Sequence, residues 1–144
     1  MLLTGTHPRT LDDKKRLGLP KRFREQLGEP GTLYVTPGPD RSLWVYTQAD
    51  LEQLAARLDQ APATDAEARV FRRLYFAQTE AVDVDRQGRV LVPERLMQFA
   101  GLTSEVVLIG VRDHIELWDA ARWQQFVETN APRFDAVAEN AFRK

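Results

Sequence analysis

The chain has 144 residues, 43% of them hydrophobic, and no cysteine. This size allows one ordinary hydrophobic core, and the absence of cysteine excludes disulfides, cysteine-based zinc sites and thiol catalysis. The formal net charge of -1 argues by itself against nucleic-acid binding, because DNA affinity comes mostly from cations that meet phosphates. No stretch is long and apolar enough for a membrane span or a signal peptide, so we expect a cytoplasmic protein that does not bind a membrane.

The average charge hides a segregation along the chain. Residues 1–24 carry seven basic and two acidic side chains, a balance of +5, and the remaining residues carry 13 basic and 19 acidic ones, a balance of -6. The seven basic residues are Arg9, Lys14, Lys15, Arg16, Lys21, Arg22 and Arg24. This concentration of cations indicates a surface that binds an anion.

A motif of ten residues occurs twice. Residues 12–21 read DDKKRLGLPK, and residues 85–94 read DRQGRVLVPE. Three identities lie 73 positions apart: Asp12 and Asp85, Arg16 and Arg89, and Pro20 and Pro93. After one deleted residue the correspondence continues at an offset of 72, where residues 43–47 lie over residues 115–119. Each copy is therefore a whole supersecondary unit.

Each unit is predicted to contain a short strand, a polar turn, a second short strand, a brief helix, a β-hairpin and a longer helix. In the first copy, the turn holds the Asp and the Arg, and the apolar strand 17–19 follows it. Pro20 suits the first position of the brief helix, and Gly28 suits its C-terminal cap. Residues 37–40, PGPD, predict the hairpin turn, and Thr47 can cap the longer helix.

The second copy carries the same signals. The strand is predicted at 90–92, followed by a brief helix with Pro93 at its first position and Gly101 at its C-terminal cap. The hairpin is expected to turn near residues 112–113, and Asp119 can cap the longer helix.

The segments outside the two copies are less strongly patterned. Residues 60–63, QAPA, interrupt the chain, and residues 64–67, TDAE, have the form of a capping box that opens a helix toward Phe76. The polar C-terminal tail is either a short docked helix or a loose segment. The predicted organisation is a first repeat at 5–50, a connecting helix at 61–77, a second repeat at 78–122 and a C-terminal tail at 130–144.

The Asp and the Arg of the motif have defined roles in a strand–turn–strand element. The Asp carboxylate can accept hydrogen bonds from backbone N–H groups of its own turn, while the Arg points outward. Arg16, with Lys14 and Lys15 beside it, can then contact phosphates or the O6 and N7 atoms of guanine in the major groove, which admits a two-stranded β-ribbon. The alternative is that Asp12 and Arg16 form a surface ion pair that holds the turn, and that the lysines are simply solvated.

Three sequence features together point to one known family. They are the twice-occurring Asp-x-x-x-Arg followed by a short apolar strand and a proline, residues 23–27 (FREQL) and residues 116–119 (ELWD). With these features, nearly the whole chain resembles the MraZ family of bacterial transcriptional regulators. The resemblance implies an α+β fold in a single compact body, made of two pseudo-symmetric SpoVT-AbrB-like β units of the swapped-hairpin type with short helices.

The resemblance also implies a function and partners. A member of this family is expected to form a ring-shaped homo-oligomer that is associated with the nucleoid. It is expected to bind double-stranded DNA at short tandem repeats upstream of its own cell-division and cell-wall gene cluster. The Asp-x-x-x-Arg turn is the expected DNA-contacting element.

The turns and their neighbouring cations define the candidate DNA-binding residues, which are Arg9, Asp12, Lys14, Lys15, Arg16, Asp85, Arg86 and Arg89. Lys15 stands where the family usually has glycine, as Gly88 does in the second copy, at a position whose backbone conformation glycine adopts easily. Acidic residues surround the arginines of the second copy. We therefore expect the first copy to dominate DNA contact and the second to serve mainly assembly.

Three other classes of function compete with DNA binding. Asp83, Asp85 and Glu94 nearly fit the loop of a calcium-binding EF-hand, although the first copy has lysines at matching positions and a strand follows. A protein–protein scaffold would use the ring without DNA. An enzyme is not expected, because His7 and His114 lie in no nucleophile motif and no phosphate loop is present. We expect no cofactor, no bound metal and no small-molecule substrate.

Overall fold

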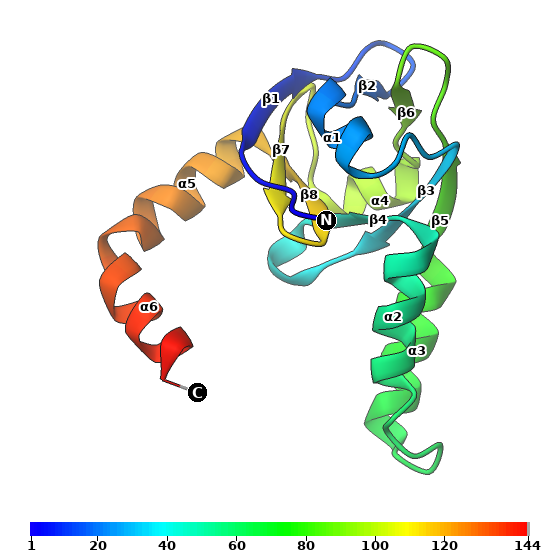
Figure 1. Cartoon of the computed structure of the whole chain (residues 1–144), viewed down its shortest axis with the longest axis vertical. Helices are drawn as coiled ribbons and strands as arrows, with labels where there is room; N and C mark the ends of the chain where they lie inside the picture. Colours follow the sequence, from blue (N-terminus) through cyan, green and yellow to red (C-terminus); the bar gives the residue numbers. More distant parts are fainter. Residues whose placement is uncertain (144) are drawn as a thin grey trace.

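The two copies of the motif form the same series of elements in the computed structural model, which describes residues 1–143 (Figure 1). The first copy contains β1 (Thr6–Thr10), β2 (Arg16–Gly18), α1 (Lys21–Gln26), β3 (Thr32–Pro37), η1 (Pro39–Arg41), β4 (Leu43–Tyr46) and α2 (Gln48–Leu58). The second copy contains β5 (Glu80–Asp83), β6 (Arg89–Leu91), α4 (Glu94–Ala100), β7 (Glu105–Val111), β8 (His114–Asp119) and α5 (Ala120–Asn130). The remaining elements are α3 (Ala66–Gln78), η2 (Ala131–Arg133) and α6 (Phe134–Phe142). The predicted order of elements is confirmed in both copies.

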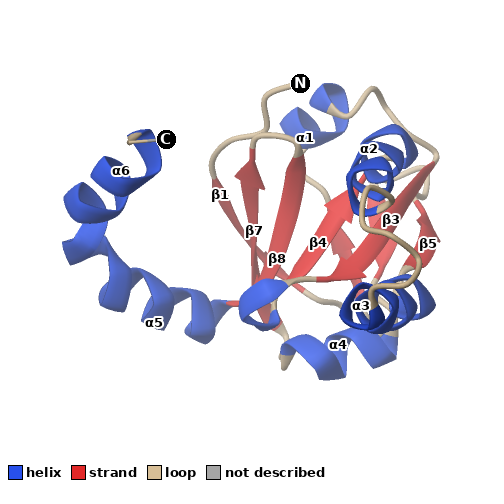
Figure 2. Cartoon of the chain, turned by 90° about the horizontal axis from the view of Figure 1, so that it is seen from below, coloured by secondary structure: helices blue, strands red, loops and turns tan. Residues whose placement is uncertain are grey.

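The strands of the two copies are exchanged. One antiparallel sheet has the order β1-β7-β8-β4-β3-β5, and a second sheet consists of β2 and β6. Strand β1 of the first copy therefore pairs with β7 of the second, β5 of the second pairs with β3 of the first, and the small sheet takes one strand from each. Figure 2 shows the strands of the large sheet side by side. The expected swapped-hairpin α+β fold in a single body is confirmed.

The main hydrophobic core lies between the β2–β6 ribbon and the large sheet. Leu17 of β2 and Val90 of β6 point into it, and they meet Phe23 of α1 and Leu96 of α4, which are equivalent residues of the two copies. All four side chains are at most 6% exposed. Burial of apolar surface is the main stabilising term of folding, so this shared core holds the ribbon and its turns in place.

Two smaller apolar clusters cover the opposite face of the large sheet. Tyr46 of β4 packs with Leu51 of α2 and Tyr75 of α3, and Trp118 of β8 packs with Trp123 of α5. These contacts anchor a helical hairpin, α2–α3, and an arm, α5–α6, which leave the body in different directions (Figure 1). None of the helices within residues 1–143 has the length and apolar character needed to cross a membrane.

The brief helices begin one residue later than predicted. Pro20 and Pro93 are the N-cap residues of α1 and α4, with φ of -56° and -61°, and the first helical positions belong to the residues after them. The ring of proline fixes φ near this value, which suits the extended N-cap as well as the first turn. At the other ends, Gly28 and Gly101 have φ of 83° and 61°, the left-handed conformation predicted for a helix C-terminus.

One of the two predicted caps of the longer helices is correct. Thr47 caps α2, because its side chain accepts a hydrogen bond from the N–H of Asp50 at 3.2 Å. Asp119 precedes α5 but makes no such contact with it. Its Oδ1 instead accepts hydrogen bonds from the N–H and the Oγ1 hydroxyl of Thr103, at 3.1 and 2.7 Å. Asp119 thus fixes the loop after α4 to the end of β8.

The connecting helix and the C-terminal segment also refine the predictions. Helix α3 is capped by Asp65, which accepts a hydrogen bond from the backbone N–H three residues later at 3.1 Å, and the predicted box beginning at Thr64 does not form. The C-terminal segment, predicted to be either a short docked helix or a loose segment, forms the helix α6. Its side chains Phe134 and Phe142 are 70% and 87% exposed. Lys144, the last residue of the predicted tail, lies outside the described residues.

Candidate nucleic-acid interface

The turn between β1 and β2 is held by Asp12. Its Oδ1 accepts hydrogen bonds from the backbone N–H groups of Lys14 and Arg16, both at 2.9 Å. The C=O of Asp12 accepts a hydrogen bond from the N–H of Lys15 at 3.0 Å, and its N–H donates to the C=O of Arg16 at 2.9 Å. The aspartate therefore satisfies the backbone donors of the turn, as the motif predicts.

The turn between β5 and β6 repeats this geometry. Asp85 Oδ1 accepts hydrogen bonds from the N–H groups of Gln87 and Arg89, both at 2.9 Å, and the N–H of Gly88 donates to the C=O of Asp85 at 2.9 Å. Lys15 and Gly88 occupy the equivalent position and have φ of 63° and 76°. Lys15 thus adopts the conformation that favours glycine, and the first turn keeps the shape of the second.

Both motif arginines are tied to their aspartates. Arg16 Nε donates to Asp12 Oδ2 at 2.8 Å, and Arg89 Nε donates to Asp85 Oδ2 at 2.9 Å. The turn bonded by its aspartate and the surface ion pair are therefore both present. Because Nε makes this contact, each guanidinium is fixed in orientation, and its terminal nitrogens hold no hydrogen-bond acceptor among residues 1–143. Such a planar donor group is suited to a phosphate or a guanine edge.

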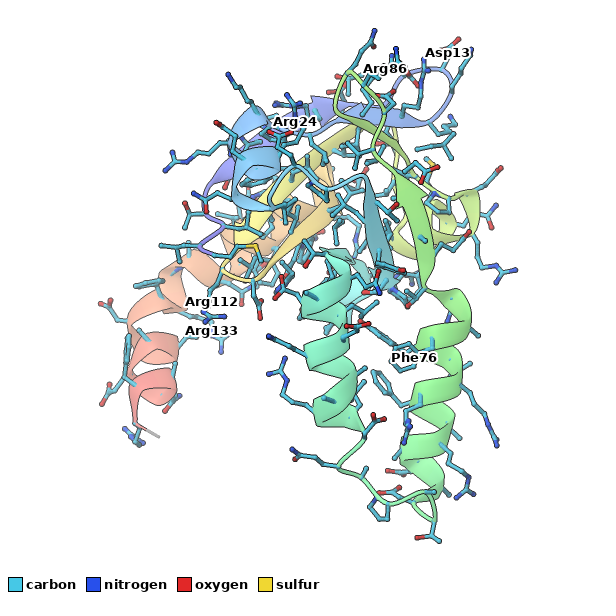
Figure 3. The ribbon with its side chains drawn as sticks, turned by 45° about the vertical axis from the view of Figure 1, so that its right-hand side comes forward. Asp13, Arg24, Phe76, Arg86, Arg112 and Arg133 are labelled. Carbon is cyan, nitrogen blue, oxygen red and sulfur yellow. The ribbon has the colours of Figure 1, made fainter. Side chains whose placement is uncertain are left out.

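The β2–β6 ribbon brings the two turns to one surface. Its register pairs residues of the two copies, Arg16 with Leu91 and Gly18 with Arg89. The residues between them point into the core, so these four share the outward face of the ribbon. In Figure 3, Asp13 of the first turn and Arg86 of the second lie at the same end of the molecule.

The pKa of each turn aspartate is lowered. For Asp12 the main cause is the hydrogen bond from the backbone N–H of Arg16, and this effect, with the Arg16 side chain and the N–H of Lys14, outweighs desolvation. The N–H and side chain of Arg89 lower the pKa of Asp85 in the same way. Each aspartate is therefore charged at neutral pH and offsets the charge of its own arginine. The excess positive charge of the surface comes from the neighbouring cations.

Those cations lie around both turns. The exposed ones at the tips are Lys14, Lys15 and Arg86. Arg9 of β1 donates a hydrogen bond from Nε to the C=O of Gly18 at 3.0 Å. Leu19, the residue after Gly18, donates from its backbone N–H to the C=O of Gly88 at 2.9 Å. Arg9 is therefore held against the end of β2 and not at the tip of the first turn. The charge imbalance along the sequence therefore does not show where each cation lies on the folded surface.

Two side chains of this surface are not among the candidate DNA-binding residues predicted from the sequence. Leu91 is 52% exposed on the outward face of β6, and strict alternation from the buried Val90 is the signal that indicates its position. Arg24 of α1 lies against the second turn, because a Cβ on Gly88 would come within 2.7 Å of its Nε and Cζ atoms. No local signal indicates this contact, since it joins the two copies.

The geometry does not match the calcium-binding interpretation. Asp83 lies in β5 and its Oδ1 accepts a hydrogen bond from Thr32 Oγ1 at 3.4 Å. The carboxylate of Asp85 is used within its own turn. In the part of the chain that the structure describes, no three His, Cys, Asp or Glu side chains are grouped to hold a metal ion.

Comparison with known proteins identifies the family. The MraZ protein family model matches the chain twice, at residues 2–74 and 75–144. The chain is 42% identical to the transcriptional regulator MraZ of Saccharopolyspora erythraea over 138 residues, which cover 96% of this chain and 95% of that protein. It is 37% identical to the transcriptional regulator MraZ of Moorella thermoacetica over 138 residues, with the same coverage, and 40% identical to that of Mycobacterium ulcerans over 140 residues, 97% of this chain and 96% of that protein. The chain, with its two equivalent turns on one ribbon, therefore belongs to the MraZ family of transcriptional regulators, which are not enzymes.

Proposed function

We propose that the chain regulates transcription by binding double-stranded DNA in a sequence-specific manner with the outward face of its β2–β6 ribbon. The observation that carries this proposal is the pair of equivalent turns on that face, each with an arginine oriented by its aspartate. A two-stranded ribbon fits the major groove, where a fixed arginine can donate to the O6 and N7 atoms of guanine. Lys14, Lys15 and Arg86 then contact phosphates on either side.

The DNA target in this proposal is a set of short tandem repeats upstream of the gene's own cell-division and cell-wall gene cluster. Relatives that match almost the whole chain are named transcriptional regulators, which supports a role on the chromosome and hence a nucleoid-associated protein of the cytoplasm. Repeated sites suit a protein that presents several linked binding faces, because linked contacts raise affinity without any new type of contact.

We also propose that the chain assembles into a ring-shaped homo-oligomer. Two exposed apolar surfaces on the projecting helices support this. Helix α3 exposes Val70, Phe71 and Leu74. The α5–α6 arm exposes Phe126, Val127, Phe134, Val137 and Phe142. Contiguous exposed apolar surface is typical of protein–protein contacts.

The charges beside these two surfaces are complementary. Helix α3 carries Arg69, Arg72 and Arg73 against one glutamate, whereas α6 carries Asp135 and Glu139 and no basic residue. Contact between the arm of one copy and α3 of the next is head-to-tail, and such contacts generate a ring where the rotation closes. A ring of this kind presents one β2–β6 face per subunit to the repeats.

A salt-dependent binding titration tests the function. Wild type, Arg16→Ala and Arg89→Ala are titrated against a fragment of tandem repeats from upstream of the gene and a scrambled fragment of equal length. Arg112→Ala serves as the control, because Figure 3 places Arg112 far from Arg86 and it is 75% exposed in its side chain. We expect Arg16→Ala and Arg89→Ala each to weaken repeat binding by about tenfold or more without a change in oligomeric size.

The titration also separates base readout from phosphate contact. Loss confined to the repeat fragment means that an arginine reads bases, whereas equal loss on both fragments with a salt slope lowered by about one means a phosphate contact. No binding by wild type at low salt contradicts the proposal on this DNA. A ring that forms but binds neither fragment would favour the scaffold interpretation.

A further inference from the structure

Each turn of the DNA-facing ribbon is covered by the short helix of the other copy. Arg24 of α1 lies against Gly88 of the second turn. The residue 73 positions later is Met97 of α4, which lines a cavity together with Asp12 and Lys15 of the first turn. The two helices therefore stand at equivalent places, but one contributes a guanidinium and the other an uncharged thioether.

The contact of Arg24 with the second turn is close. A Cβ on Gly88 would lie 2.7 Å from both Nε and Cζ of Arg24, and Gly88 is itself buried. Glycine at this position therefore serves two purposes, since it adopts a φ of 76° and leaves room for the guanidinium. The first turn has Lys15 at the same place and faces the slimmer Met97.

The buried side of Arg24 has no polar contact. Its Nε is buried, and no acceptor for it exists among residues 1–143. The side chain as a whole is only half-buried, so the exposed part of the residue lies away from Nε. A charged group that packing holds in one orientation, without a carboxylate partner, keeps its full charge for an external anion.

The charges of the second turn make this anion a phosphate. Asp85 already offsets the charge of Arg89, so the excess positive charge at the second turn comes from other cations, and Arg24 lies directly against this turn. We infer that Arg24 binds a phosphate of the DNA backbone next to the second turn, so that the first copy supplies a cation to the site of the second. This inference rests on the proposed function, and it adds a phosphate contact from the first copy to the DNA contacts of the second turn.

The test exchanges Arg24 for the side chain found at the equivalent position. Arg24→Met removes the guanidinium and keeps an unbranched apolar chain against Gly88, and Arg22→Met removes the same charge from an exposed position of the same helix. We expect Arg24→Met to weaken binding to repeat and scrambled DNA equally, by about fivefold to tenfold at roughly 0.1 M salt, and to lower the salt slope by about 0.9. Arg22→Met should leave the slope closer to that of wild type.

A double-mutant cycle locates the contact. If Arg24 acts at the second turn, its effect is coupled to Arg89→Ala, which releases that turn from DNA, and adds to that of Arg16→Ala. Additivity with both, or an Arg24→Met titration identical to wild type, overturns the inference. Arg24→Lys is the second variant. It keeps a cation, so a salt slope near wild type for Arg24→Lys supports phosphate binding, and a slope as low as that of Arg24→Met contradicts it.

The outcomes separate this inference from the proposed function. If Arg16→Ala weakens repeat binding and Arg24→Met does not, only the role of Arg24 is wrong. If wild type binds neither fragment, DNA binding and the role of Arg24 are both wrong. Urea unfolding of each variant shows whether a loss of binding comes from a loss of fold, and a variant that unfolds gives its place to Arg24→Lys.

Discussion

The imidazole of His114 stacks on the indole of Trp44, with ring centroids 3.9 Å apart and ring planes 17° apart. His114 Nδ1 lies 2.9 Å from Asp113 Oδ1, and His114 Nε2 lies 2.9 Å from Glu116 Oε2. Burial lowers the pKa of His114, but the hydrogen bonds to Glu116 and Asp113 and the charges of both outweigh it, so the pKa is raised above its ordinary value. The ring thus links the tip of the β7–β8 hairpin to β4, and these contacts favour its protonated form.

His114→Gln is therefore expected to reduce stability more in weak acid than in weak alkali. Because the folded-state pKa is raised above the unfolded value, protonated His114 contributes stability that is fully present below the unfolded pKa and is lost as pH rises through the folded pKa. We expect a loss of about 2 kcal/mol at low pH, the size found for hydrogen bonds to charged groups. Urea unfolding of wild type and variant at about pH 5 and about pH 9 measures it.

His7 provides the control for this experiment. Burial, with Arg9 and Arg22 nearby, lowers the pKa of His7, so the folded protein favours its neutral form. The stability difference between wild type and His7→Gln should therefore grow as pH rises. An equal loss at both pH values for His114→Gln would mean that His114 is not charged in the folded protein.

The left-handed position of the two turns predicts opposite effects for glycine and lysine. Lys15→Gly relieves a backbone conformation that costs an L-residue on the order of 1 kcal/mol, so the free energy of unfolding should rise by up to about that amount, while DNA affinity falls with the lost cation. Gly88→Lys takes on the strain and also collides with Arg24, and should lose about 2 kcal/mol or more. Urea unfolding checks both. A Gly88→Lys protein as stable as wild type would contradict the close packing of Arg24.

The turn aspartates predict a dependence on acid. The lowered pKa of Asp12 and Asp85 means that each contributes stability present above the unfolded pKa and lost as pH falls through the folded pKa. The double variant Asp12→Asn/Asp85→Asn should lose part of the fall in unfolding midpoint that wild type shows between about pH 7 and about pH 3.

The same double variant separates specificity from affinity. It removes two negative charges from the ribbon face that we propose binds DNA and no longer orients the two arginines, so its affinity for scrambled DNA should rise while its preference for the repeats falls. Binding titrations against both fragments measure the two effects. A preference equal to that of wild type would show that the aspartates do not position the arginines for base readout.

The exposed arm predicts a change of assembly. Phe134→Asp/Phe142→Asp places charge on the apolar side of α6, where the two rings are 70% and 87% exposed, and should shift the protein to smaller species in sedimentation velocity. Asn140→Asp adds charge to an exposed position of the same helix and should not. Binding to a single repeat should survive in the arm variant, whereas the gain from several repeats is lost. Full assembly by the arm variant would exclude α6 from the contact between subunits.

Local structure was predictable because each copy carries its own turn-forming and helix-terminating residues. The Asp of the turn, the proline before α1 and α4, the glycine after them and the PGPD hairpin each restrict the backbone within a few residues. These signals predicted the order of elements in both copies. The helix caps were less predictable, because a carboxylate can accept a hydrogen bond from a donor that is distant in the sequence. The carboxylate of Asp119 accepts one from Thr103, sixteen residues before it.

These local signals did not predict which strands of the two copies pair with each other. Strands β2 and β6 have three residues each, and such short segments carry too little pattern to select a partner. The exchange of strands followed from the family resemblance alone. Arg24 is a first-copy residue that lies against the second turn, so the charge pattern along the chain assigns its effect to the wrong turn. Contacts across the copies become visible only when the strands are paired.

The pairing of two unlike copies in one chain gives the outward face of the β2–β6 ribbon a polarity. Two identical copies joined by the same exchange would be related by a two-fold axis, and their shared face would look the same after half a rotation. Here one turn carries Lys14 and Lys15, and the other carries Gln87 and Gly88. A protomer that binds DNA with this face, as we propose, would therefore distinguish the two directions along a duplex. Sites repeated in one direction match a row of such protomers, whereas a palindrome would require every second protomer to be reversed.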